Sequence, residues 1–149
     1  MNTAEHSVKI RRARLEDAGR IAVLSGQLGY PATKEQMKIR LKRALKAKNG
    51  TCFVAETKKD GLIGWTHVSV TPLLEVEQRA ELNGLVVDEK ARSCGAGGEL
   101  LKATENWARK MGCVGMSVRS NVLRKRAHGF YLKRGYEHYK TQKAFRKDL

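Results

Sequence analysis

Three glycines near the middle of the chain carry the clearest chemical signal in the sequence. Gly95, Gly97 and Gly98 come after an arginine, Arg92, and after an apolar run at residues 82–87, and a helical pattern follows them. The first N–H groups of a helix have no partner within it and lie at the positive end of its dipole. A strand that turns into a helix at glycines therefore presents bare N–H groups to one point, which suits a phosphate group.

The spacing of these glycines excludes two known phosphate loops and leaves a plain tight turn as the alternative. No Gly-Lys-Ser or Gly-Lys-Thr follows, as a Walker A loop requires, and Leu100 stands where the dinucleotide fingerprint needs its third glycine. The position between an apolar strand and a helix, beside Arg92, favours phosphate binding over the plain turn.

The three cysteines, Cys52, Cys94 and Cys113, point away from disulfide or metal chemistry. Their number is odd and no Cys-x-x-Cys is present, which argues against a disulfide framework and against a zinc knuckle, so we expect no metal site. Cys94 differs from the others because it lies in the glycine turn, where a helix N-terminus favours the thiolate.

Length and composition predict one soluble domain in the cytoplasm. The chain has 149 residues, of which 41% are hydrophobic and 30% are charged. No apolar stretch approaches the roughly 18 residues that cross a bilayer, and the N-terminal residues lack the apolar core of a secretory signal. We therefore expect no membrane partner.

The net charge of +15, from 30 lysines and arginines against 15 acidic residues, favours polyanionic partners such as nucleic acid. The basic residues are dispersed over four segments, and aromatic residues make up only 6% of the chain. Solvated helix faces therefore explain the charge better than a dedicated nucleic-acid groove, which stays the alternative.

Elements that would position the glycine turn follow from the apolar periodicity. A strand, a helix and a strand at 79–118 form a crossover unit, so these two strands should run parallel. The whole order predicts one α/β (α+β) domain at residues 1–149, with a mixed, mostly antiparallel central sheet flanked by helices. The predicted elements are a strand at 8–14, helices at 15–28 and 34–48, strands at 51–57, 62–70 and 79–87, a helix at 97–111, a strand at 113–118, a helix at 123–134 and a final strand or hairpin at 136–145.

Two stretches resemble the signatures of the GCN5-related N-acetyltransferases, the GNAT superfamily. Residues 87–97, VDEKARSCGAG, are similar to the first signature, in which an apolar strand leads to Arg/Gln-x-x-Gly-x-Gly/Ala. Residues 126–136, RAHGFYLKRGY, are similar to the second, A-x-x-F-Y-x-x-x-G-F/Y. The order of the predicted elements also matches that fold from end to end, so the resemblance implies a GNAT-like acyl-CoA N-acyltransferase fold.

The resemblance implies that acetyl-CoA is the co-substrate and lies in a V-shaped opening between the strands at 81–87 and 113–118. The backbone of Leu85 and Val87 would bond the pantetheine arm as a neighbouring strand does, and the N–H groups of 93–98 would hold the pyrophosphate beside Arg92. The residues expected to bind acetyl-CoA are Leu85, Val86, Val87, Arg92, Ser93, Cys94, Gly95, Ala96, Gly97, Gly98, Asn121 and Tyr131.

Asn121 resembles a family asparagine that bonds the cofactor, although Tyr131 follows it by ten residues, which is longer than the usual spacing. The cations Arg124, Lys125 and Arg126 would contact the ribose phosphate or form a solvated helix face, and the second is favoured for any one of them.

The implied reaction is direct acetyl transfer from the thioester to an amine, and it needs two proton transfers. A free alkyl amine is protonated at neutral pH, so a base must remove a proton, and an acid must protonate the leaving thiolate. Tyr131 matches the family tyrosine near the CoA sulfur and is our general acid; its alternative is a packing role. Glu81 lies where some members carry a water-linked base, and a surface carboxylate is its alternative. His67 and His128 rank below Glu81.

The acceptor is indicated only by charge. Glu75, Glu77 and Glu81 cluster in an otherwise basic chain, which favours a cationic primary amine of small or medium size. Residues 81–87 also resemble aminoglycoside-modifying members of the family. A protein N-terminus or lysine, a CoA-binding module without turnover, and a basic protein that binds nucleic acid or ribosomes remain alternatives.

Members of this family are often dimers, commonly through C-terminal strands. The predicted strand at 136–145 could serve this purpose, so we expect a homodimer.

Overall fold

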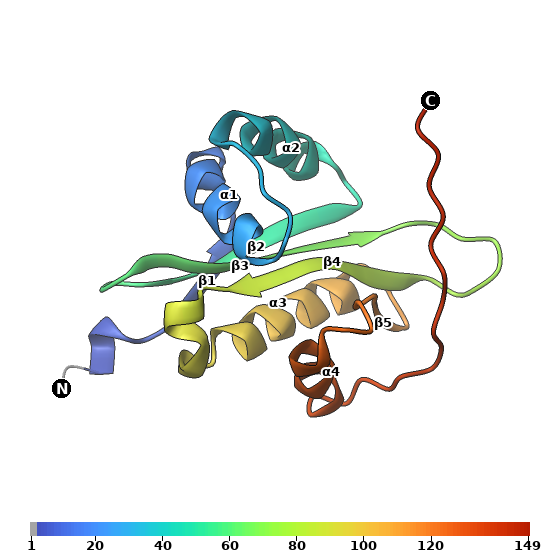
Figure 1. The fold of residues 1–149 in the computed structure, drawn as a ribbon. Helices are drawn as coiled ribbons and strands as arrows, with labels where there is room; N and C mark the ends of the chain where they lie inside the picture. Colours follow the sequence, from blue (N-terminus) through green and yellow to red (C-terminus); the bar gives the residue numbers. More distant parts are fainter. Residues whose placement is uncertain (1–2) are drawn as a thin grey trace. The chain divides into compact units, whose positions relative to one another are not determined.

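A computed structural model describes residues 3–149 (Figure 1). The chain divides into two compact units, residues 1–118 and 119–149. Each unit is described by itself below. Among the described residues, no helix has the length and apolar character needed to cross a membrane, and no cluster of His, Cys, Asp and Glu could hold a metal ion.

The first unit contains a sheet whose strands lie side by side in chain order. Neighbouring strands are antiparallel except for the last pair, β4 and β5, which are parallel, as the crossover pattern predicted. The strands are β1 (Lys9–Arg12), β2 (Gly50–Thr57), β3 (Gly61–Val70), β4 (Arg79–Val87) and β5 (Gly115–Val118).

Three helices cover the two faces of this sheet. Figure 1 shows α1 (Ala18–Gln27) and α2 (Lys34–Lys46) on one face and α3 (Ala96–Lys110) on the other. The first face packs apolar residues of α1 and α2 against strand residues such as Val54 and Val86. On the second face, Leu100 and Trp107 of α3 pack against the sheet. The sheet is thus buried on both sides, as in layered α/β folds.

Local signals in the sequence begin and end several of these elements. The capping box at the start of α2 is confirmed, because Thr33 accepts a bond from the backbone N–H of Gln36 while the Gln36 side chain accepts one from Thr33. The Asp60-Gly61 pair joins β2 to β3 in an antiparallel hairpin, with Gly61 at a φ of +69°.

The second unit contains one helix, α4 (Lys125–Leu132), among its described residues. Gly135 follows it at a φ of +85°, as expected of a glycine that ends a helix. The predicted strand at 136–145 is wrong, because residues 136–149 form neither helix nor strand. Beyond the partly buried Tyr136, the alternating pattern buries no side chain in this segment: Tyr139 is 73% exposed and Phe145 is 92% exposed. An alternating segment without a face to bury has no reason to be held in a sheet.

Candidate active site

Strands β4 and β5 separate halfway along β4. Their parallel pairing runs from Arg79 and Gly115 to Leu82 and Val118, where β5 ends. On its other side, β4 stays paired with β3 as far as Val87. Within the first unit as described, residues 83–87 of β4 therefore have a strand on one edge only. Such an edge offers N–H and C=O groups to an extended ligand, which is what the expected pantetheine position at residues 85–87 requires.

A β-bulge lies where the two strands separate. His67 pairs with Gly84 and Val68 pairs with Leu82, so Asn83 is an extra residue in β4. A bulge bends its strand and increases the local twist. Two hydrogen bonds between β3 and β4 hold the bend: Asn83 Nδ2 donates to Ser69 Oγ at 2.8 Å, and the buried hydroxyl of Thr66 donates to the Gly84 carbonyl at 2.8 Å.

The glycine turn has the open backbone that the sequence predicted. A 3₁₀ helix (Glu89–Cys94) follows β4, and α3 begins after Gly95, whose φ of +83° favours glycine. Gly95 has no side chain with which to cap α3, and Glu99 N–H bonds the Gly95 carbonyl at 3.2 Å as the first turn closes. The N–H groups of residues 96–98 thus lack partners within the helix. Cys94 is exposed, and its thiol is free.

Arg92 lies back over the end of β4. Its Nε donates to the Val87 carbonyl at 3.4 Å, and its guanidinium lies 4.0 Å from the carboxylate of Glu89. The cation therefore stays beside the glycine turn, but it engages a carbonyl of the strand expected to bind pantetheine.

Asp88 anchors the glycine turn to α1, and our reading of the sequence missed it. Its carboxylate accepts bonds from the Lys90 backbone N–H, from Arg20 and from Gln27. The Gln27 side chain also accepts a bond from the Glu89 N–H at 3.0 Å. The bond from Lys90 N–H, together with the Arg20 cation, holds the pKa of Asp88 below its usual value despite burial, which acts to raise it. An acidic residue directly after an apolar strand is a recognisable cap signal, but its partner 68 residues away is not visible in the sequence.

Glu81 and His67 lie on the sheet face covered by α1 and α2. Ala80, the neighbour of Glu81, packs on the α3 side, so alternation places Glu81 on the other face, between Ser69 of β3 and Ser117 of β5. On that same face, His67 is flanked by Cys52 and Gly84. Burial lowers the pKa of His67, which keeps its imidazole neutral at neutral pH. Two side chains able to accept a proton thus lie on one face, near the bulge.

Glu75 and Glu77 lie on the connection between β3 and β4, and both are exposed. Figure 1 shows this connection projecting beyond the ends of the two strands. The acidic cluster predicted from the sequence is therefore divided between a projecting loop and the sheet face that holds Glu81.

Tyr131 lies on α4 in the second unit and is partly buried. Its ring packs edge-on against Phe130, with centroids 5.2 Å apart, and lies 5.7 Å from the ring of Tyr136. Burial raises the pKa of Tyr131, although the Arg124 cation acts in the opposite direction. The phenol is therefore protonated at neutral pH, as a general acid must be.

Asn121 belongs to a turn that precedes α4. Its side-chain oxygen accepts a bond from Leu123 N–H at 2.9 Å, and its carbonyl contacts His128 Nε2 at 2.8 Å. His128 thus braces this turn. Arg124, Lys125 and Arg126 are exposed, as a solvated face would be.

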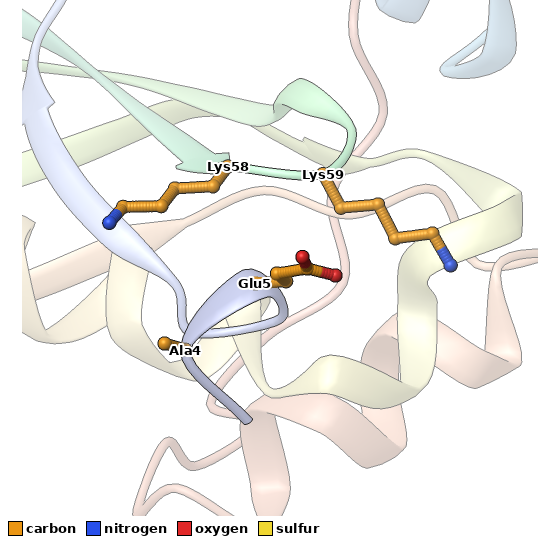
Figure 2. A pocket seen from close by; sticks show the side chains of 4 residues that line it. All are labelled: Ala4, Glu5, Lys58 and Lys59. Atoms are coloured by element: carbon orange, nitrogen blue, oxygen red, sulfur yellow. The ribbon is translucent and has the colours of Figure 1, made fainter. Parts of the chain in front are cut away.

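A cavity of about 440 Å³ lies elsewhere in the first unit, between the N-terminal 3₁₀ turn and the β2–β3 hairpin. Figure 2 shows Glu5 between Lys58 and Lys59, whose side chains extend in opposite directions. All three are exposed, Ala4 supplies the remaining wall, and no residue expected to act in catalysis lines the cavity. It lacks the apolar walls of a typical substrate pocket, so it is not our candidate.

Comparison with known proteins gives a consistent result. The profile of the acetyltransferase (GNAT) family matches residues 19–136. A Bacillus subtilis (strain 168) protein described as the uncharacterized N-acetyltransferase YhfO is 28% identical over 135 residues, which cover 87% of this chain and 90% of that protein.

Solved structures share the fold along nearly the whole chain. A transcriptional regulator from Bacillus halodurans C-125 is 25% identical, with a TM-score of 0.80 over 93% of this chain and 100% of its own. The aminoglycoside N-acetyltransferase AAC(6')-Iy, solved in complex with CoA, is 18% identical, with a TM-score of 0.85 over 96% of each chain. The predicted fold class is therefore confirmed.

Proposed function

The chain belongs to the acetyltransferase (GNAT) family, and we propose that it transfers the acetyl group to a primary amine of a small or medium-sized cationic acceptor. The family match confirms the resemblance predicted from the two signatures. It also makes the chain an N-acetyltransferase with acetyl-CoA as its acetyl donor.

The observation that carries the proposed site is the course of β4. This strand presents Glu81 before the bulge, a one-sided backbone edge at residues 83–87 after it, and the glycine turn at its end. An extended donor lying along that edge, with its pyrophosphate at the N–H groups of residues 96–98, would bring its thioester end toward the bulge. We therefore assign acetyl-CoA binding to residues 85–87 and 92–98, with Asn121 as a further contact.

In the proposed reaction one side chain acts as the general base and another as the general acid. Glu81 removes a proton from the acceptor ammonium, the amine nitrogen attacks the thioester carbonyl carbon, the carbon–sulfur bond breaks, and the nitrogen loses its second proton to solvent as the amide forms. Tyr131 gives its proton to the leaving sulfur, a role that its raised pKa supports. His67 is the second candidate for the base, because it is neutral at neutral pH and lies on the same sheet face as Glu81.

A cationic acceptor is favoured by the carboxylates near the start of β4. Glu75, Glu77 and Glu81 are the acidic side chains between residues 61 and 87, and a protonated amine is attracted to such a group. AAC(6')-Iy, which shares the fold, is named for a cationic class of acceptor. A protein N-terminus or lysine is the competing acceptor.

The test measures acetyl-CoA turnover with a panel of polyamines, aminoglycosides, amino acids and basic peptides. The measured signal is the CoA thiol that each reaction releases. We expect the highest kcat/KM with a small polyamine or aminoglycoside. The double variant Glu75→Gln/Glu77→Gln should raise the acceptor KM, whereas Glu137→Gln/Asp148→Asn, an equal charge change on the exposed C-terminal residues, should not. An unchanged KM in the first variant, or a preference for peptides, would contradict the small-amine proposal.

Three broader expectations remain predictions from the sequence: one domain over residues 1–149, a cytoplasmic location and a homodimer. The predicted route to the dimer, a strand at residues 136–145, is absent from the described chain. Sedimentation equilibrium tests the oligomeric state directly.

A further inference from the structure

The outward side of α2 is a ridge of lysines. Lys34, Lys38, Lys42 and Lys46 recur at four-residue intervals, which places them in one row along the helix, and all four are exposed. The side of α2 next to this row is buried against the rest of the first unit, through Met37 and Leu41. We call the four lysines the α2 ridge.

The charge of the α2 ridge is not neutralised within the protein. In the part of the chain that the structure describes, the ion pairs include those of Arg11, Arg20, Arg92 and Lys102, and none uses a cation of α2. Two exposed arginines, Arg40 and Arg43, add to the charge, and Glu35 is the helix's one acidic residue.

Like charges at four-residue spacing destabilise a helix. The α2 ridge therefore keeps an arrangement that opposes folding of the helix that carries it, and an external anion would relieve this repulsion. At one end of the ridge, the Lys34 side chain lies near Gly19 of α1, where an added Cβ would be 3.4 Å from the lysine Cδ.

From this arrangement we infer that the α2 ridge binds the phosphodiester backbone of double-stranded nucleic acid. Successive lysines rise by about 6 Å along the helix axis, at 1.5 Å per residue, so the ridge spans several phosphates. Lysine ammonium groups act as compact point charges toward phosphate. Contacts of this kind hold a duplex without reading its sequence. The inference is independent of acetyl transfer.

Other occupants fit the α2 ridge less well. A helix that lies in a membrane surface needs a continuous exposed apolar face, whereas Met37 and Leu41 of α2 are buried and its exposed large hydrophobic side chains are the two residues Ile39 and Leu45. Protein interfaces rely on aromatic and arginine anchors and are depleted in lysine. Single strands are held by aromatic side chains that stack on bases, and α2 contains none.

The test compares two variants of equal charge. Lys38→Gln/Lys42→Gln/Lys46→Gln removes three lysines of the ridge, and Lys58→Gln/Lys59→Gln/Lys110→Gln removes three exposed lysines elsewhere. Binding of fluorescent 20-base-pair RNA and DNA duplexes is measured by anisotropy between about 50 and 200 mM salt. For the wild type we expect log Kobs to fall with log[salt] at a slope of about −3.6 if four lysines contact phosphates.

The ridge variant should bind a duplex at least about 10-fold more weakly at 100 mM salt, with a slope about 2.7 units shallower, and the control should keep the wild-type slope. Equal weakening of both variants would show a dispersed field and overturn the inference, as would no duplex binding by the wild type. Equally tight, ridge-dependent binding to phosphatidylserine vesicles or polyglutamate would also overturn it. Unchanged circular dichroism and melting temperature show that each variant is folded.

Discussion

The β4–α3 region and the C-terminal unit, residues 119–149, each carry one of the two family signatures, but they differ in what holds them in place. In the first, Leu82, Val86 and Leu100 are buried, and the bounds of β4 match the prediction at both ends. In the second, α4 has no fully buried residue, and the predicted final strand is absent. Periodicity predicted the structure where there was a core against which a face could pack.

The largest effect should come from a negative charge placed in the glycine turn of the β4–α3 region. Gly97→Glu puts a carboxylate where residues 96–98 present open N–H groups, so it should repel the pyrophosphate. At a concentration of 100 Kd, CoA should stabilise the wild type by about 2.7 kcal/mol. We expect the corresponding thermal shift to vanish in Gly97→Glu.

Gly26→Glu is the control for this change, because Gly26 is exposed on α1 with nothing near its added Cβ. It should keep the full thermal shift with CoA. A normal shift in Gly97→Glu would remove the glycine turn from the proposed CoA site.

Tyr131→Phe tests whether the C-terminal unit, residues 119–149, supplies a catalytic group. Loss of the general acid should lower kcat by about 100-fold while the CoA-induced thermal shift is unchanged. Tyr139→Phe, on an exposed tyrosine of the same unit, should leave kcat unchanged. If Tyr131→Phe retains full kcat, the tyrosine is a packing residue.

Glu81→Gln and His67→Gln distinguish the two candidate bases on the sheet face. We expect Glu81→Gln to lower kcat by on the order of 10–100-fold, because the amine must then lose its proton to another group or to water. If His67 is the base, the acid limb of the wild-type kcat/KM should lie below pH 6.5, since burial lowers the pKa of His67. Loss of that limb in His67→Gln, with full activity in Glu81→Gln, would reassign the base to His67.

Asp88→Asn tests the anchor that strengthens the first region. The folded-state pKa of Asp88 is lowered, so its stabilisation is present above the unfolded pKa of about 3.9 and is lost as pH falls through the folded value. At pH 7 the variant should lose about 1–2 kcal/mol of unfolding free energy, measured with urea. The difference from the wild type should shrink below about pH 4. A constant difference between pH 7 and pH 3 would contradict this account.

Deletion of residues 139–149 should have the smallest effect on stability. All of these residues are exposed, so we expect the melting temperature to change by less than about 2 °C. Sedimentation of the deleted and full chains shows whether this segment also sets the oligomeric state. A large drop in melting temperature, together with a change from dimer to monomer, would show that the segment is ordered by a second chain.

The sequence predicted those features that depend on local pattern. The order of elements, the parallel pairing of β4 with β5, the cap at Thr33 and the open helix start after Gly95 all follow from periodicity and residue type. The bulge at Asn83 and the bonds from Arg20 to Asp88 could not be predicted in this way. Both depend on partners in other elements, and nothing in the local composition marks them.

The extra residue in β4, Asn83, reverses the order in which odd-numbered and even-numbered side chains face the two sides of the sheet. Before it, an even-numbered residue, Ala80, points toward α3, and after it the odd-numbered Leu85 and Val87 do so. Because the extra residue absorbs this change of phase, deletion of Asn83 would leave each later side chain on its present face and would remove only the local bend that separates β4 from β5.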